Sequence, residues 1–161
     1  MKVHLISCQH FKNYKWSSVM SSLEIKEITP LTTQETTQIA KWYFEQWDCH
    51  RADASFEQVL ELVTATKDKV GFFVHFNNEV AGAAEIKHQQ GAAWLDGVYV
   101  DEQFRGLGIS NALIEYAKEK AANLSWQPLY LKCEPHLVDL YEKFGFKVVE
   151  MDGAKSIMRC E

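Results

Sequence analysis

The pattern of hydrophobic and polar positions divides residues 23–161 into short strands and helices. Alternating or β-branched runs predict strands, and apolar residues at helical spacing predict helices. The expected strands are residues 23–28, 70–76, 79–87, 92–100 and 129–133, followed by a closing hairpin of 148–150 and 156–160 around Asp152-Gly153. The expected helices are residues 33–49, 55–66 and 111–122, and a short one that starts near Leu137 and stops at Gly145.

Local signals support several of these boundaries. Ser55 and Gln58 have the spacing of a capping box, and Thr32 or Thr33 is expected to cap the first helix. Asn77-Asn78 suits a tight turn between two strands. The order of elements indicates one compact domain.

The segment that joins residues 98–100 to the helix at 111–122 has the features of an anion site. A strand ends there in a turn that contains Arg105, Gly106 and Gly108, and a helix begins directly after it. The first amides of a helix lack intrahelical partners, and glycines let a backbone approach a ligand closely. Neither the P-loop nor the dinucleotide fingerprint fits these residues. The turn therefore predicts a site for phosphate or pyrophosphate.

A second block follows, in which the expected strand 129–133 leads to the sequence Leu140-Tyr-Glu-Lys-Phe-Gly-Phe146. Tyr141 is the residue of chemical interest, because a phenol with a pKa of about 10 stays protonated at neutral pH and can donate a proton.

The two blocks together resemble the GCN5-related N-acetyltransferase (GNAT) superfamily. Its coenzyme loop is Arg/Gln-x-x-Gly-x-Gly/Ala, and Arg105, Gly108 and Ser110 stand at the three specified positions, with Ser110 departing from the preferred Gly or Ala. The run 140–146 resembles the family's Tyr-Glu-Lys-Leu-Gly-Phe signature. Many relatives carry Asn seven residues before the tyrosine, where this chain has Glu134.

The resemblance implies acetyl-coenzyme A as cosubstrate, with no metal, and Tyr141 as the group that protonates the departing thiolate. It also implies a single-domain α/β (α+β) GNAT fold over residues 23–161, with a mixed sheet splayed at the coenzyme-binding strand and about four flanking helices. The residues expected to bind the coenzyme are Val98, Tyr99 and Val100 along the strand and Arg105, Gly106, Leu107, Gly108, Ile109 and Ser110 in the loop.

Asp96 is the first candidate for the base that deprotonates the attacking amine. Period-two alternation places it on one face with Trp94, Val98 and Val100, so we expect a partly desolvated carboxylate with a raised pKa or an affinity for a cationic amine. The run from Trp94 to Gly106 is similar to a strand of polyamine acetyltransferases that has Glu at this position. The shorter Asp favours a bridging water.

Two other residues compete with Asp96 as the base. Glu85 lies in the neighbouring expected strand, either functional or facing solvent, and His75 has the flanks of an ordinary half-buried strand residue. Cys133 is a poor acyl carrier because no His partner is recognisable.

The resemblance implies that the first two helices and their connection line the acceptor side. Tyr43 and Trp47 share one helical face, which favours core packing, and Trp47 with Asp48 is the candidate pair for acceptor contact. A small polyamine-like primary amine is the leading acceptor, with aminoglycosides and protein lysines as alternatives. A noncatalytic acyl-coenzyme A sensor is the competing function. The resemblance also implies a homodimer.

Composition narrows the class of protein. The chain has 161 residues, of which 47% are hydrophobic, and this suffices for a hydrophobic core. Its formal charge of -5 argues against nonspecific nucleic-acid binding, which needs a basic surface. Cys8, Cys49, Cys133 and Cys160 have no zinc-site spacing, and no run is long enough to span a membrane, so a cytoplasmic protein is expected. Residues 1–22 contain several lysines and no acidic residue, and we interpret them as an N-terminal extension outside the core.

Overall fold

The computed structural model of the protein describes residues 23–161, so the expected extension 1–22 lies outside the described residues. A seven-stranded sheet has the order β1-β2-β3-β4-β5-β7-β6. Its strands are β1 (Leu23–Glu27), β2 (Lys69–Phe76), β3 (Glu79–Gln89), β4 (Ala92–Val100), β5 (Leu129–Cys133), β6 (Lys147–Asp152) and β7 (Lys155–Cys160). The pair β4–β5 is parallel, and the other neighbours are antiparallel. The sheet is therefore mixed, as expected.

Four α-helices flank the sheet. They are α1 (Thr33–Tyr43), α2 (Phe56–Thr64), α3 (Ile109–Asn123) and α4 (Val138–Glu142). A π-helical turn, η3 (Phe44–Asp48), continues α1, and short 3-10 turns η4 (Glu102–Phe104) and η5 (Pro135–Leu137) precede α3 and α4. The helix expected over 33–49 thus changes its hydrogen-bonding pattern after Tyr43.

The two predicted helix caps have different outcomes. At α2 the capping box is confirmed, because the Gln58 amide donates to Ser55 Oγ at 3.2 Å and the Ser55 amide donates to Gln58 Oε1 at 3.0 Å. At α1 the prediction of a side-chain cap is wrong. Thr32 occupies the N-cap, but its hydroxyl donates to the Thr29 carbonyl at 2.8 Å, which closes the preceding turn instead.

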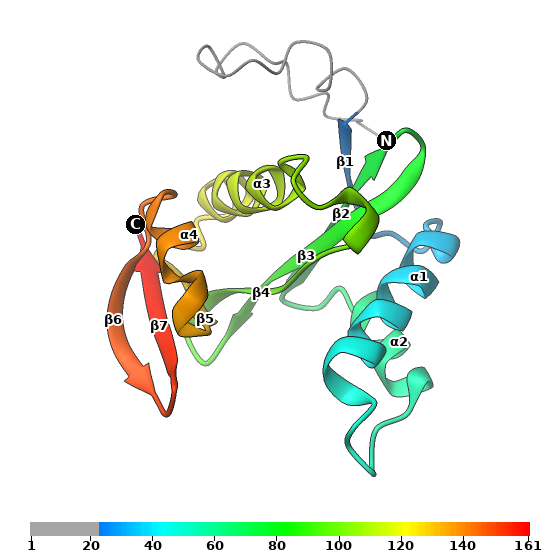
Figure 1. Ribbon diagram of the computed structural model, residues 1–161, viewed down its shortest axis with the longest axis horizontal. Helices are drawn as coiled ribbons and strands as arrows, with labels where there is room; N and C mark the ends of the chain where they lie inside the picture. Colours follow the sequence, from blue (N-terminus) through cyan, green and yellow to red (C-terminus); the bar gives the residue numbers. More distant parts are fainter. Residues whose placement is uncertain (1–22) are drawn as a thin grey trace.

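The helices lie on opposite faces of the sheet (Figure 1). The alternation in β2 explains the two layers: Phe72 and Val74 pack in the cluster that contains α3 and α4, whereas Phe73 packs in the cluster of α1 and α2. Because both faces of these strands are buried, nearly every position in them is apolar, which explains the near-continuous apolar runs in the sequence. We call the two sides the α3/α4 face and the α1/α2 face.

The sheet splits between β4 and β5. The two strands are in register at Ala93 with Leu129 and at Trp94 with Tyr130, and β4 continues to Val100 beyond this last rung. The rings of Trp94 and Tyr130 are 5.4 Å apart at the rung. The splayed sheet expected from the resemblance is therefore confirmed.

A bulge in β4 changes the direction of the side chains beyond Asp96. The register with β3 shifts between Ala83 and Glu85, and Gly97 opposite has a φ of 62°. As a result Val98 and Val100 pack on the α3/α4 face, and Tyr99 packs on the α1/α2 face. The expectation that Asp96 shares a face with Val98 and Val100 is wrong, because simple alternation does not survive the bulge.

Candidate active site

The predicted anion loop joins β4 to α3 on the α3/α4 face. Gly106 and Gly108 have φ values of 80° and 79°, a left-handed conformation that glycine adopts without steric cost, and Gly108 is the N-cap of α3. The amides of Ile109 and Ser110 belong to the first helical turn, which has no intrahelical acceptors for them. The Arg105 side chain is 57% exposed, and its Nε donates to the Val100 carbonyl at 3.3 Å.

Gly82 brings this loop close to the sheet, and sequence reasoning missed it. A Cβ at Gly82 would lie 2.7 Å from the Tyr99 carbonyl oxygen and 2.9 Å from the Ile109 side chain. Only glycine lets β3, β4 and the first turn of α3 approach so closely. The signal in the sequence is a lone glycine inside a run of alanines.

Tyr141 lies on α4, near enough to Cys133 at the end of β5 and to Asp96 of β4 for both to affect its pKa, and it is 7% exposed. Its ring packs against Phe146 at 5.9 Å. Burial raises the pKa of Tyr141 to about 12, with smaller contributions from Cys133 and from the Asp96 carboxylate. The phenol therefore stays protonated across the neutral range, and it lies within electrostatic reach of Asp96.

Asp96 projects from β4 just beyond the last rung shared with β5. Its side chain is 56% exposed, and its Oδ2 is 2.5 Å from the Lys87 ammonium. Its Oδ1 accepts the Gly97 amide at 2.9 Å. The expected desolvation among apolar neighbours is wrong, because the bulge at Gly97 directs this carboxylate toward a lysine rather than toward Val98.

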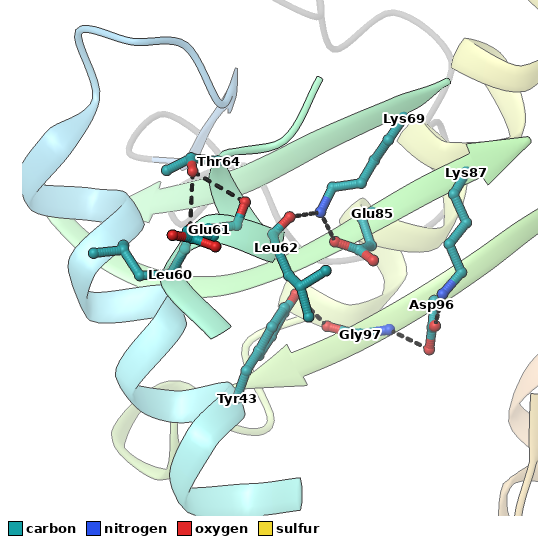
Figure 2. A network of polar contacts seen from close by, with 10 residues as sticks. All are labelled: Tyr43, Leu60, Glu61, Leu62, Thr64, Lys69, Glu85, Lys87, Asp96 and Gly97. Atoms are coloured by element: carbon teal, nitrogen blue, oxygen red, sulfur yellow. Dashed lines mark hydrogen bonds and ion pairs between the residues drawn. The ribbon is translucent and has the colours of Figure 1, made fainter. Parts of the chain in front are cut away.

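Glu85 lies opposite Asp96 in the β3–β4 ladder. Its carboxylate is 2.6 Å from the Lys69 ammonium, with only 16% and 10% of the two side chains exposed. Lys69 also donates to the Leu62 carbonyl near the C-terminal end of α2, where a cation is favoured (Figure 2). The solvent-facing interpretation of Glu85 is wrong, since the residue belongs to a mostly buried ion pair.

Tyr43 connects α1 to the bulge. Its hydroxyl donates to the Gly97 carbonyl at 2.6 Å (Figure 2), and a Cβ at Gly97 would lie 2.7 Å from that hydroxyl oxygen. Burial raises the pKa of Tyr43 well above its ordinary value, and the charges of Glu85 and Asp96 raise it further. Tyr43 is a core residue, as its spacing predicts, and it also satisfies a backbone carbonyl at the bulge.

Trp47 and Asp48 point to different surroundings. The Trp47 ring is 5.0 Å from Tyr43 and 6.3 Å from Tyr99, and the residue is 46% exposed, so it forms an open aromatic wall beside β4. Asp48 instead pairs with Arg51 at 3.1 Å. Both residues of that pair line a shallow pocket of about 250 Å³ between the 48–54 segment and α2. The structure thus brings Trp47, but not the Asp48 carboxylate, toward Tyr43 and Tyr99.

His75 and Cys133 both have ordinary structural surroundings. His75 lies between β1 and β3, near Lys26 and 3.6 Å from Glu35, and its pKa is lowered by burial and by Lys26. Cys133 is buried with its Sγ 3.6 Å from Met158 Sδ, and burial raises its thiol pKa. A thiol with a raised pKa is a weak nucleophile at neutral pH.

The two lysines of the site, Lys69 and Lys87, were not predicted from the sequence. A usable signal existed, since Lys87 follows Glu85 at the period-two spacing that places both on one face of β3. Within residues 23–161, no group of three or more His, Cys, Asp or Glu side chains is arranged to hold a metal ion. None of the helices in that range is long and apolar enough to cross a membrane.

Comparisons with known proteins agree with this geometry. A sequence profile of the acetyltransferase (GNAT) domain matches residues 30–159. A comparison with curated proteins finds no significant match. Among solved structures, the PaiA N-acetyltransferase from Thermoplasma acidophilum, in complex with coenzyme A, is 21% identical with a TM-score of 0.70, over 87% of this chain and 99% of that one.

Two further structures have similar folds. Escherichia coli ElaA is 22% identical with a TM-score of 0.65, over 86% of this chain and 99% of that one. An acyl-CoA N-acyltransferase from Pseudomonas aeruginosa is 18% identical with a TM-score of 0.68, over 87% of this chain and 100% of that one. At these identities the likeness concerns the fold.

Proposed function

The chain belongs to the acetyltransferase (GNAT) domain family, and we propose that it transfers an acetyl group from acetyl-coenzyme A directly to a primary amine of a small molecule in a ternary complex. The loop from Arg105 to Ser110 holds the pyrophosphate with helix amides and one guanidinium. The part of β4 beyond the split, from Val98 to Val100, offers backbone groups to the pantetheine arm. Homodimerisation and a cytoplasmic location stay predictions.

The observation that carries this proposal is the position and protonation of Tyr141. The phenol is 7% exposed, lies where β4 and β5 separate, and has a pKa raised to about 12. A group that must protonate a thiolate has to hold its proton at working pH, and a phenol does so at neutral pH even without the raised pKa. A protein that only binds acyl-coenzyme A needs no such proton donor.

The chemistry follows from these groups. The amine loses a proton to Asp96, or to a water that Asp96 orients, and its lone pair attacks the thioester carbon. Backbone amides near Val100 stabilise the oxyanion of the tetrahedral intermediate. The intermediate collapses, the carbon–sulfur bond breaks, and the thiolate takes the proton of Tyr141. The nitrogen gives its second proton to solvent as the amide forms, and solvent returns a proton to Tyr141. No acyl-enzyme forms, in keeping with the buried, protonated thiol of Cys133.

The test is coenzyme A release from acetyl-coenzyme A in the presence of polyamines, other small amines, aminoglycosides and lysine peptides. We expect Tyr141→Phe to lower turnover by about 10²–10⁴-fold, the usual contribution of a positioned acid, with little change in acetyl-coenzyme A affinity. Tyr116→Phe is the matched control, because that tyrosine of α3 is also partly buried but donates to Glu27 of β1. Equal turnover in both variants would remove Tyr141 from the mechanism.

The same measurement separates the alternatives. Release with polyamines would support the acceptor class that the β4 sequence favours, and release with aminoglycosides or lysine peptides would replace it. No release with any acceptor, while acetyl-coenzyme A still binds, would favour the noncatalytic sensor.

A further inference from the structure

The acceptor side of the split contains two lysine–carboxylate pairs. Lys69 pairs with Glu85 at 2.6 Å, and Lys87 pairs with Asp96 at 2.5 Å (Figure 2). The four groups come from three adjacent strands and carry no net charge together. Asp96, the candidate base, therefore already has a cationic partner in the protein.

The two pairs differ in how available they are to a ligand. The Lys69–Glu85 pair is 10% and 16% exposed, and Lys69 is held further by the Leu62 carbonyl. The Lys87–Asp96 pair is 27% and 56% exposed. An ammonium has three donors, and the one bond that the described residues provide to Lys87 is the bond to Asp96. A small molecule can exchange partners with this pair and not with the other.

The more exposed pair, Lys87–Asp96, also lies next to the split between β4 and β5. Asp96 lies two residues beyond Trp94, which makes the last rung between β4 and β5. Lys87, on β3, is the register partner of Trp94. The charge of Asp96 reaches Tyr141, whose pKa it helps to raise. An amine that attacks a thioester beside Tyr141 therefore approaches Lys87 and Asp96 together.

We propose that the acceptor is a zwitterionic small molecule, a primary amine that carries a carboxylate or phosphate. This inference rests on the proposed function. Its ammonium group binds Asp96 before losing a proton to it, and its anionic group binds Lys87. This exchange replaces one ion pair by two and leaves no charge without a partner. A polyamine would have to displace Lys87 from Asp96 and leave two cations side by side, and like charges at that separation repel each other.

The decisive assay compares acceptors that differ only in the anionic group. Lysine is tested against cadaverine, ornithine against putrescine, and phosphoethanolamine against ethanolamine, with kcat/KM taken from coenzyme A release. An ion pair with Lys87 is available only to the anionic member, so we expect that member to be preferred about tenfold or more in at least one pair. A preference for the amine without the anion in every pair would overturn the inference.

Variants assign the preference to Lys87. Lys87→Gln should reduce the ratio of the two kcat/KM values toward one, and Lys87→Arg should retain it. Lys120→Gln is the matched control, since the Lys120–Glu27 pair has the same 2.5 Å separation and a similar lysine exposure, 25% against 27%, but joins α3 to β1. An unchanged ratio in Lys87→Gln would contradict the assignment.

The failures can be told apart. If diamines release coenzyme A and the amino acids and phosphoethanolamine do not, this inference is overturned and the proposed function stands. If no acceptor releases coenzyme A, the proposed function is overturned and the inference with it.

Discussion

The two sides of the split between β4 and β5 are built differently. On the α3/α4 face, the candidate coenzyme site consists of one contiguous segment, from Val98 to Ser110, and most of its groups are backbone amides. On the α1/α2 face, the candidate acceptor site consists of side chains from β2, β3, β4 and α1 joined by ion pairs and one phenolic hydrogen bond. The first side depends on local conformation, and the second depends on register.

This difference has a chemical reason within the proposed function. A backbone cradle recognises a phosphate whatever side chains surround it, so it suits a cosubstrate that every relative would share. Side-chain pairs such as Lys87–Asp96 can be replaced one at a time, so they suit an acceptor that differs between relatives. Variants on the two faces should therefore affect different measured quantities.

The largest effect is expected at the buried pair of the α1/α2 face. Lys69→Met leaves the Glu85 carboxylate mostly buried without its cation, and breaking such a pair costs about 3–5 kcal/mol of unfolding free energy. Denaturant unfolding measures the change. The double variant Lys69→Met/Glu85→Leu should recover much of the loss, because neither charge remains buried.

A surface pair provides the control for this prediction. Lys132→Met removes the partner of Asp152 in a pair that is 42% and 56% exposed, and we expect a loss below about 1 kcal/mol. Equal losses in Lys69→Met and Lys132→Met would mean that the Lys69–Glu85 pair has no special role in the fold.

Tyr43→Phe should have an intermediate effect. The substitution leaves the Gly97 carbonyl without its hydroxyl donor, at a cost of about 1–3 kcal/mol of unfolding free energy. It should also raise KM for the amine, because the bulge that directs Asp96 toward Lys87 loses its tether to α1. Tyr116→Phe, which removes a hydroxyl bond to Glu27, should lower stability without that change in KM.

The same variant has a pH signature. The pKa of Tyr43 is raised in the folded protein, so the folded state keeps a proton that the unfolded state loses above about pH 10. The stabilisation is complete below that pH and declines as the pH rises further. The fall in unfolding free energy above pH 10 should be less steep in Tyr43→Phe than in the parent, and parallel curves would contradict the assigned pKa.

The coenzyme side of the molecule could be predicted from the sequence better than the acceptor side. The strands were predicted to within a few residues because period-two alternation survives in most of them, and Asp152-Gly153 marked the last hairpin. The loop from Arg105 to Ser110 was recognisable because its functional groups are consecutive. The positions of Tyr141 and of the split came from the resemblance and not from periodicity.

The acceptor side could not be predicted because its groups meet only through strand register. Lys69, Glu85 and Asp96 lie on three strands, and irregularities between Val74 and His75 and between Ala83 and Glu85 shift which residues are opposite one another. The bulge at Gly97 then reverses the alternation that would have placed Asp96 beside Val98. A glycine in a strand is a known signal of a bulge, and it is the one local sign that the alternation should not be extended past it.

Apart from the surface control Lys132→Met, the smallest effect on stability is expected in the coenzyme loop, where it tests the comparison most directly. Gly106 has a φ of 80° and no atom within 4 Å of a Cβ added there, so Gly106→Ala introduces backbone strain without a clash. The left-handed conformation costs a non-glycine residue about 1–2 kcal/mol. Gly153→Ala, in the hairpin between β6 and β7, is the matched control, with a φ of 61° and the same open space around an added Cβ.

Both variants should lose similar stability in denaturant unfolding. Only Gly106→Ala should weaken acetyl-coenzyme A binding, measured by calorimetry. In both variants the ratio of kcat/KM for lysine and cadaverine should stay at the parent value. If Gly106→Ala altered that ratio as much as Lys87→Gln does, the two faces would act as one site, and the division between a backbone-built cosubstrate side and a side-chain-built acceptor side would have to be abandoned.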